Sequence, residues 1–179
     1  MFTSIKVSGF GGQGVMVVGQ LLCHSAIQEG KHTTYLPRYG PEKRGGFADV
    51  SVMISDTEIG SLMTEKIDCL MALNQDAIVR FGEAVKPGGV MIVNSSLCEI
   101  PEREDITIFA IDTGKVTDEL GSSKVMNVVL MGAFIASTDI LNKESVAKAI
   151  DIKLGKKPEF IELNRKALEA GIANVEKIR

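Results

Sequence analysis

The chain has 179 residues, of which 45% are hydrophobic and 24% are charged, so it is about one domain long and has the composition of an ordinary globular protein. Its formal net charge of -3 leaves no basic excess, which argues against nucleic acid as a partner. The cysteines Cys23, Cys69 and Cys98 lie far apart without a CxxC pair, so the chain has too few ligands for a zinc site or an iron–sulfur cluster.

The first part of the chain predicts a strand, a glycine-rich turn, a helix and a second strand. These segments are Ile5–Ser8, Gly9–Gly14, Val15–Glu29 and Thr33–Leu36. Two strands joined by one helix usually pair in parallel, so we expect the first two strands to be neighbours in the sheet.

The next strand pattern alternates three aliphatic residues with three others, namely Val50, Val52 and Ile54 with Asp49, Ser51 and Met53. This alternation predicts a strand over Ala48–Ile54 that has one face drier than the other. Glu58–Ser61 is expected to pair with it across a turn, as an antiparallel hairpin.

The second half of the chain continues the alternation of strands and helices. Strands are expected at Cys69–Leu73, Val90–Asn94 and Ile106–Asp112. Helices are expected at Gln75–Val85, Thr117–Leu120, Lys124–Ser137, Asn142–Ile150 and Pro158–Lys177. Ser122 or Ser123 is expected to cap the long apolar helix, which should be central because it is apolar nearly all round.

No repeat and no linker divides the chain. We therefore predict an α/β fold, with a single three-layer α/β/α domain over residues 1–179 and a mixed, largely parallel sheet. The N-terminus lacks the features of a secretory signal. The longest near-apolar run, Val125–Ala136, is shorter than the ~20 residues that a bilayer span needs. We expect a cytoplasmic protein with no membrane span.

The glycine-rich turn matches the pattern G-x-G-x-x-G at Gly9, Gly11 and Gly14. Between a strand and a helix, such a turn lets backbone N–H groups approach a phosphate. The alternative is that the glycines only pack the helix tightly against the sheet. No Asp or Glu lies between Lys31 and Pro41, so the acidic contact of a dinucleotide site to ribose is missing. The lysine of a nucleoside triphosphate loop is missing as well.

No other set of residues forms a complete active site, and no catalytic residue is predicted. The histidines, His24 and His32, have neither a matched nucleophile nor metal-ligand spacing. The acidic cluster is expected to be a solvated loop face, and it consists of Glu99, Glu102, Glu104 and Asp105.

A second unusual stretch, YGPEKRGG at Tyr39–Gly46, follows the second strand. In an α/β sheet this position lies at the carboxyl edge, beside the first glycine turn. One interpretation is a surface turn with solvated charges. The other is that Arg44, with Arg38 and Lys43 nearby, faces phosphates held on the first loop or a carboxylate on another protein.

Together these two stretches resemble the gamma subunit of the 2-oxoacid:ferredoxin (or acceptor) oxidoreductases, and the fold implied is that of the gamma domain of pyruvate:ferredoxin oxidoreductase. The resemblance extends over nearly the whole chain. It includes DCLMALNQDA at 68–77, KPGGVMIVNSS at 86–96, ELGSSKVMNVVLMGAFIA at 119–136 and PEFIELNRKALEAG at 158–171. The last two segments look most like the 2-oxoglutarate branch, with pyruvate and indolepyruvate oxidoreductases as alternatives.

The resemblance implies a subunit that binds no cofactor alone. Thiamine diphosphate, Mg and iron–sulfur clusters are expected on alpha, beta and usually delta subunits, with ferredoxin or a similar acceptor taking the electrons. This chain is expected to assist assembly and to close over coenzyme A. The residues implied in this binding are Gly9, Gly11, Gly12, Gln13, Gly14, Tyr39, Gly40, Arg44, Gly45 and Gly46.

Two other interpretations stay open. A free-standing nucleotide-binding protein would also present the glycine turn, and it would bind NAD(P) or FAD without partners. A purely structural interaction subunit would use the same loops only to contact its neighbours.

Overall fold

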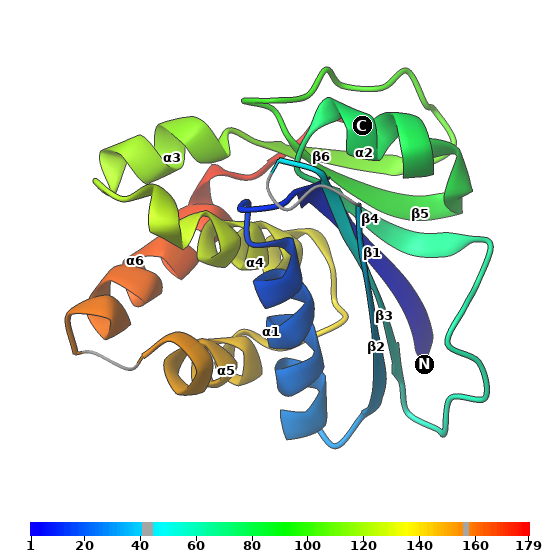
Figure 1. The fold of residues 1–179 in the computed structure, drawn as a ribbon, viewed down its shortest axis with the longest axis horizontal. Helices are drawn as coiled ribbons and strands as arrows, with labels where there is room; N and C mark the ends of the chain where they lie inside the picture. Colours follow the sequence, from blue (N-terminus) through cyan, green and yellow to red (C-terminus); the bar gives the residue numbers. More distant parts are fainter. Residues whose placement is uncertain (41–44, 156–157) are drawn as a thin grey trace.

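The computed structural model describes residues 1–40, 45–155 and 158–179 (Figure 1). Within them lies a seven-stranded sheet with strand order β2-β3-β1-β4-β5-β6-β7. The strands are β1 (Phe2–Phe10), β2 (His32–Tyr39), β3 (Phe47–Ser55), β4 (Ile67–Ala72), β5 (Val85–Asn94), β6 (Thr107–Ile111) and β7 (Glu176–Lys177). Strands β1, β4, β5 and β6 pair in parallel, whereas β3 runs antiparallel to both β1 and β2, and β7 runs antiparallel to β6.

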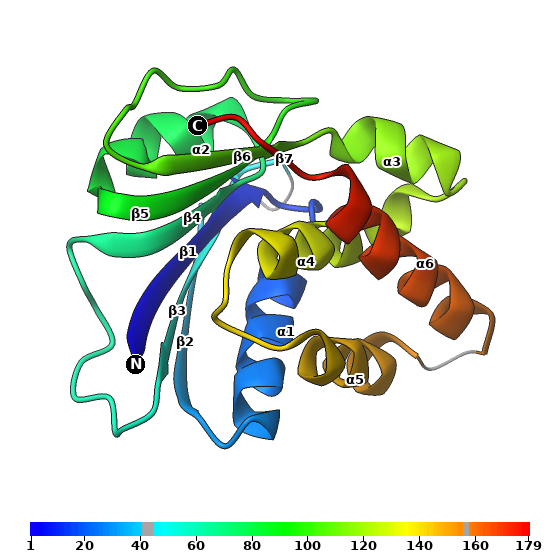
Figure 2. The same cartoon turned by 180° about the vertical axis from the view of Figure 1, so that it is seen from behind.

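The helices cover the two faces of the sheet unequally. They are α1 (Val15–Gln28), α2 (Gln75–Phe81), α3 (Thr113–Glu119), α4 (Met126–Ser137), α5 (Lys143–Leu154) and α6 (Pro158–Asn174), with 3-10 turns at Gly82–Ala84 and Ser123–Val125. Helices α1, α4, α5 and α6 lie on one side of the sheet and α2 lies on the other (Figures 1 and 2). The predicted α/β class, with a mixed sheet and helices on both faces, is confirmed.

Strand β4 shows why the sheet is buried on both faces. Its apolar run sends Cys69 and Met71 into the core beneath α1 and α4, while Leu70 and Ala72 belong to the separate core beneath α2. A strand with alternate residues in two cores must be apolar throughout, as the sequence pattern indicated.

Helix α1 packs closely on β3 because of one glycine. A Cβ added to Gly19 would lie 2.7 Å from Cγ1 of Val50 and 3.1 Å from the ring of Tyr35. The missing side chain therefore lets the helix approach β3, which separates β1 from β2.

The predicted pairing of the first two strands is wrong. Strand β3 inserts between β1 and β2, so these two run in the same direction without sharing hydrogen bonds. The predicted hairpin at Glu58–Ser61 is also wrong, because both edges of β3 are already occupied by β1 and β2. The pairing of β3 with β1, which is distant in sequence, and with β2, across a short connection, therefore decided the strand order and left no free edge for Glu58–Ser61.

Several boundaries differ from the predicted ones for local reasons. Helix α3 begins earlier, because the Asp112 side chain accepts a hydrogen bond from Lys115 N–H at 2.9 Å. Strand β5 begins at Val85 and runs through the Pro-Gly-Gly segment that was predicted to precede it. Neither Ser122 nor Ser123 forms a side-chain cap for the central helix.

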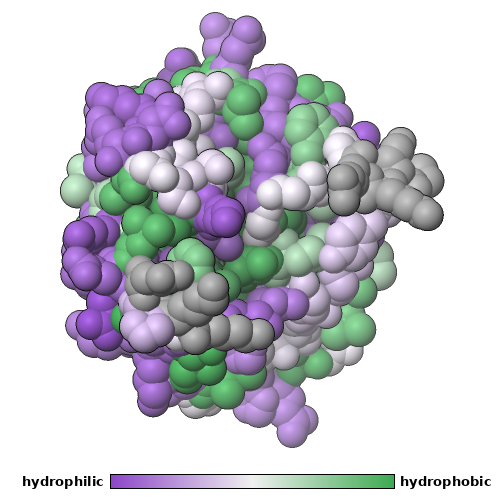
Figure 3. Space-filling model, turned by 60° about the vertical axis from the view of Figure 1, so that its left-hand side comes forward, coloured by the Kyte–Doolittle hydropathy of each residue, from purple (hydrophilic) through white to green (hydrophobic). Residues whose placement is uncertain are grey.

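The surface on the helical side of the molecule mixes hydrophobic and hydrophilic residues. Turned so that the left-hand side of Figure 1 comes forward, the molecule shows separate green apolar areas among purple hydrophilic ones (Figure 3). In the described parts of the chain, none of the helices has the length and apolar character needed to span a bilayer.

Helices α4 and α6 cross in direct backbone contact. A Cβ added to Gly132 on α4 would lie 2.3 Å from the Leu168 carbonyl oxygen and 2.9 Å from the Cα of Gly171 on α6. A Cβ on Gly171 would lie 2.1 Å from the Val129 carbonyl oxygen. Since backbone atoms cannot move aside as flexible side chains can, both positions require glycine.

We expect Gly132→Ala to lower the free energy of unfolding by about 3 kcal/mol, because the new methyl group overpacks this crossing. The melting temperature should fall by about 2–4 °C for each kcal/mol lost. Thermal and urea unfolding would measure the change. Gly60→Ala is the matched control, since nothing lies within 4 Å of its added Cβ. Equal stability of the two variants would contradict the proposed close packing.

Candidate functional site

The two glycine-rich loops meet at one edge of the sheet. Strand β1 ends at Phe10, which pairs with Phe47 at the start of β3. One residue farther along, the Gly11 N–H donates to the Gly46 carbonyl oxygen at 2.9 Å. The structure therefore brings the first loop beside the described end of the second, because β3 is paired directly with β1.

The backbone of these loops requires glycine at several positions. Gly12, Gly14 and Gly45 have φ angles of 103°, 81° and 74°, in the left-handed region that side chains disfavour. Gly9 has another constraint, since its added Cβ would lie 2.5 Å from Oε1 of Gln13 and 2.8 Å from Cβ of Leu73. The loop thus has no room for a side chain at Gly9, whereas a Cβ on Gly12 or Gly45 would meet no atom within 4 Å in the part of the chain that the structure describes.

Gln13 holds the first loop in shape. Its Oε1 accepts a hydrogen bond from Phe10 N–H at 2.6 Å, and its Nε2 donates to the Leu73 carbonyl oxygen at 3.3 Å. The side chain therefore ties the loop to the end of β4. Of the residues expected to bind a ligand, Gln13 is the one with an evident positioning role.

A polar network continues along the same edge. The Leu73 carbonyl oxygen also accepts from Nδ2 of Asn94, at the end of β5, at 3.2 Å. The Asn94 Oδ1 in turn accepts from Oγ1 of Thr113 at 2.9 Å and from Oγ of Ser96 at 2.6 Å. The motif search did not assign these residues to the site. The signal for Asn94 is a polar side chain at the final position of a buried strand.

The N-terminus of α1 opens onto the first loop. Gly14 is its N-cap and makes no side-chain cap, and no acidic residue lies in the first turn. The first bond into the helix runs from Val18 N–H to the Gly14 carbonyl oxygen at 3.0 Å, so the amides before Val18 carry the partial positive charge of the helix end. This arrangement suits an anion.

The start of α4 lies against the same glycine. A Cβ added to Gly14 would lie 3.1 Å from the Cβ of Asn127 and 3.5 Å from its Nδ2. The Oδ1 of Asn127 accepts from the N–H of Val128 at 2.9 Å. The central helix therefore brings one amide side chain to the mouth of the glycine loop.

The other predicted residues divide between the two faces of the molecule. Tyr39 is 66% exposed at the end of β2, and the Gly40 N–H donates to the Phe47 carbonyl oxygen at 2.8 Å. Arg44 and Lys43 lie outside the described residues. Arg38 donates from Nε to Oδ1 of Asp49 at 3.1 Å, on the sheet face opposite α1; its expected nearness to Arg44 and Lys43 involves residues outside the described ranges.

Nucleophilic and metal chemistry find little support among the residues that the structure describes. Burial raises the pKa of Cys69 and of Cys98 to about 12, so neither forms a thiolate near neutral pH. His24 and His32 are exposed. Within residues 1–40, 45–155 and 158–179, no three His, Cys, Asp or Glu side chains gather as a metal site. The loop edge offers backbone N–H groups at the start of α1 and the Asn127 amide as contacts for a ligand.

Several proteins of known name are similar in sequence to this chain over most of its length. The chain is 36% identical over 155 residues to "2-oxoglutarate synthase subunit KorC" of Methanocaldococcus jannaschii, which covers 84% of this chain and 82% of that protein. It is 33% identical over 168 residues to "Ketoisovalerate oxidoreductase subunit VorA" of Methanothermobacter marburgensis. That match covers 93% of this chain but 35% of the relative, so the chain spans about a third of the length of VorA.

The fold is shared with a solved gamma subunit. The keto/oxoacid ferredoxin oxidoreductase gamma subunit from Geobacter sulfurreducens superposes with a TM-score of 0.82 and 33% sequence identity, over 96% of both chains. The family model described as pyruvate ferredoxin/flavodoxin oxidoreductase matches residues 4–174, which include the first glycine loop and every helix described above. By this match, which extends over most of its length, the chain belongs to the pyruvate ferredoxin/flavodoxin oxidoreductase family.

Proposed function

We propose that this chain is the gamma-type subunit of a 2-oxoacid:ferredoxin or acceptor oxidoreductase complex, with 2-oxoglutarate as the substrate. The full-length likeness to a gamma subunit and to a 2-oxoglutarate synthase subunit supports this proposal. Pyruvate or another 2-oxoacid is the alternative substrate. In this proposal, alpha, beta and delta subunits hold thiamine diphosphate, Mg and the iron–sulfur clusters, which supply the decarboxylation and electron-transfer chemistry.

Within that complex, the paired loops are assigned to the phosphates of coenzyme A. The observation that carries this assignment is the Gly11 to Gly46 hydrogen bond, which joins the loops beside the open end of α1. Added Cβ atoms at Gly12 and Gly45 would meet nothing within 4 Å among the described residues, which favours a ligand above the loops. Backbone N–H groups would donate to phosphate oxygens, and Arg44 would supply the charge that the second loop requires.

This role needs no catalytic side chain on the chain itself. A domain that closes over coenzyme A positions the thiol carrier and excludes water from the transfer step. Gln13 and Asn94 would act by keeping the loop edge rigid, since both bond to the same carbonyl oxygen at Leu73. Because the loop edge is already ordered before coenzyme A binds, less conformational entropy is lost on binding.

The sheet order argues against a free-standing dinucleotide-binding protein. In such proteins the second strand lies beside the first, and its end carries an acid for the ribose. Here the neighbour of β1 on that side is β3, which runs antiparallel, and β2 ends in Arg38 and Tyr39. The beginning of β3 therefore occupies the position where the ribose-binding acid would lie.

Gly11→Ala tests the coenzyme A assignment with little strain. Gly11 lies outside the left-handed region, and its added Cβ would contact Gly46 O at 3.7 Å and Gly45 N at 3.8 Å. The methyl group would fit but would narrow the mouth between the loops. We expect the KM for coenzyme A of the assembled complex to rise about tenfold, equivalent to about 1.4 kcal/mol, while the KM for the 2-oxoacid stays the same.

Arg44→Ala should produce the same selective change, and Gly60→Ala serves as the control. If Gly11→Ala, Gly11→Val and Arg44→Ala all leave the KM for coenzyme A unchanged, the loops do not contact coenzyme A. Altered assembly without altered KM would favour a purely structural interaction subunit.

Purification of the tagged chain from its native source should bring with it the subunits that bind thiamine diphosphate and iron–sulfur clusters. The recovered complex should reduce ferredoxin with 2-oxoglutarate faster than with pyruvate, and the isolated chain should have neither activity. Recovery of the chain alone with bound NAD(P) or FAD would contradict the proposed role. Faster turnover of pyruvate would overturn only the substrate assignment.

A further inference from the structure

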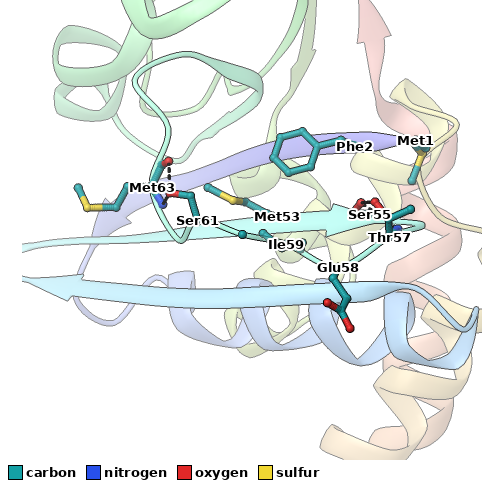
Figure 4. Close-up of a pocket in the computed structure, with 10 residues that line it drawn as sticks. Met1, Phe2, Met53, Ser55, Thr57, Glu58, Ile59, Ser61 and Met63 are labelled. Carbon is teal, nitrogen blue, oxygen red and sulfur yellow. Dashed lines mark hydrogen bonds between the residues drawn. The ribbon is translucent and has the colours of Figure 1, made fainter.

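The sheet face opposite α1 is covered differently on its two halves. Helix α2 covers β4, β5 and β6, where an apolar core forms beneath it. Over β1 the helix α2 reaches only with its end, where Phe81 lies against Lys6, and the described helices leave most of β3 and β2 uncovered on this face. Instead, the connection of residues 56–66, here called the strap, lies along these strands (Figure 4). Figure 4 shows a neighbouring pocket under the same strap, whose lining residues, among them Met53, Ser61 and Met63, stand on the near side of the strands while the helices lie behind them.

Charged residues occupy the floor of this half-covered face. Lys6 on β1 pairs in register with Ser51 on β3, and Asp49 on β3 pairs with Arg38 on β2. Lys6 Nζ donates to Asp49 Oδ1 at 2.9 Å and to Ser51 Oγ at 2.6 Å, and Arg38 Nε donates to the same Asp49 oxygen at 3.1 Å. Two cations thus share one carboxylate.

Of the two cations, Lys6 is poorly solvated compared with an ordinary surface charge, whereas Arg38 is half-exposed. The side chains of Lys6 and Asp49 are 9% and 0% exposed, and that of Arg38 is 52% exposed. Burial lowers the pKa of Lys6, although the hydrogen bond and charge of Asp49 oppose this effect. The Lys6 Nζ and the Arg38 Cζ also lie 4.8 Å and 5.9 Å from the ring centroid of Phe81. The group has a net charge of one positive unit beside apolar surface.

A cavity of about 170 Å³ opens between this charged floor and the strap. Its polar lining comes from Lys6, Arg38 and Ser51 on the strands and from Thr64 and Glu65 on the strap. Its apolar lining includes Leu36, Leu62, Met63 and Phe81. This volume is comparable to the ~150 Å³ engineered cavity that holds benzene in another protein.

Arg38 has donors left for a ligand. Its Nε bonds to Asp49, while Nη1 and Nη2 find no acceptor among the residues that the structure describes. A guanidinium edge matches a carboxylate in geometry and charge. Glu65 lines the same cavity without an ion pair to either cation among the described residues, so it is a competing anion at the rim.

We propose that this cavity binds a small organic carboxylate, whose charged group contacts Arg38 and Lys6 and whose apolar body lies against Leu36, Leu62, Met63 and Phe81. A monoanion would neutralise the excess positive unit of the Lys6, Asp49 and Arg38 group. The cavity volume limits the body to about the size of a benzene ring or a branched aliphatic chain. This site lies on the sheet face and is independent of the glycine loops and of the function proposed for them.

The probes are isovalerate and isovaleramide, which have similar shapes but differ in charge. Each would be titrated into the labelled full chain, with binding followed by NMR chemical shifts. We expect saturable shifts at Lys6, Arg38, Leu62 and Met63 with isovalerate, and about tenfold weaker binding of the amide. Equal binding of acid and amide, or shifts confined to the glycine loops, would overturn the proposal.

Three variants test which charged side chains recognise the carboxylate of the ligand. Arg38→Gln should weaken isovalerate binding about tenfold, whereas Glu65→Gln should preserve or strengthen it by removing the competing carboxylate. Arg165→Gln is the matched control, because Arg165 is also an exposed arginine paired with an aspartate but lies on α6. Unchanged binding in Arg38→Gln would overturn the proposal. Should that variant fail to fold, the comparison of acid with amide in the unaltered chain still decides.

Discussion

The insertion of β3 between β1 and β2 is the constraint on which the rest of the structure depends. Its backbone bonds join Phe10 to Phe47 across the ladder and continue into the bond from Gly11 N–H to the Gly46 carbonyl oxygen. One consequence is that two loops from different parts of the sequence lie side by side. Another is that strands β1, β3 and β2 present Lys6, Asp49 and Arg38 together on the opposite face. A single pairing choice therefore creates both surfaces to which binding is assigned.

The loop edge combines rigid support with an open surface. Gln13 and Asn94 converge on the Leu73 carbonyl oxygen and hold the ends of β1, β4 and β5 together. Gly12 and Gly45, by contrast, adopt left-handed conformations, and an added Cβ on either would contact no atom of residues 1–40, 45–155 or 158–179 within 4 Å. This division suits a wall that must keep its shape while a ligand or another subunit approaches.

The opposite face follows a different physical principle. There a buried lysine and a half-exposed arginine share one aspartate beside Phe81, so these three groups together carry one positive unit. A charge in such surroundings is costly unless it gains a partner. The apolar strap residues Leu62 and Met63, which are 54% and 75% exposed, lie next to this charge. A ligand with both a carboxylate and an apolar body satisfies the two features at once.

By itself the sequence determined the α/β class, most elements, the two glycine-rich loops and the family, because periodicity, glycine spacing and motif order are local properties. Strand β4 was recognisable because a strand between two cores must be apolar throughout. Strand order was decided only by the tertiary structure, since backbone pairing joins residues far apart in sequence and outweighs the usual parallel neighbour of a strand, helix, strand unit. Pairing of β2 with β3 places Arg38 against Asp49, and pairing of β5 with β4 places Asn94 at the loop edge. Side-chain partners of this kind depend on which strands become neighbours, and no local pattern specifies that choice.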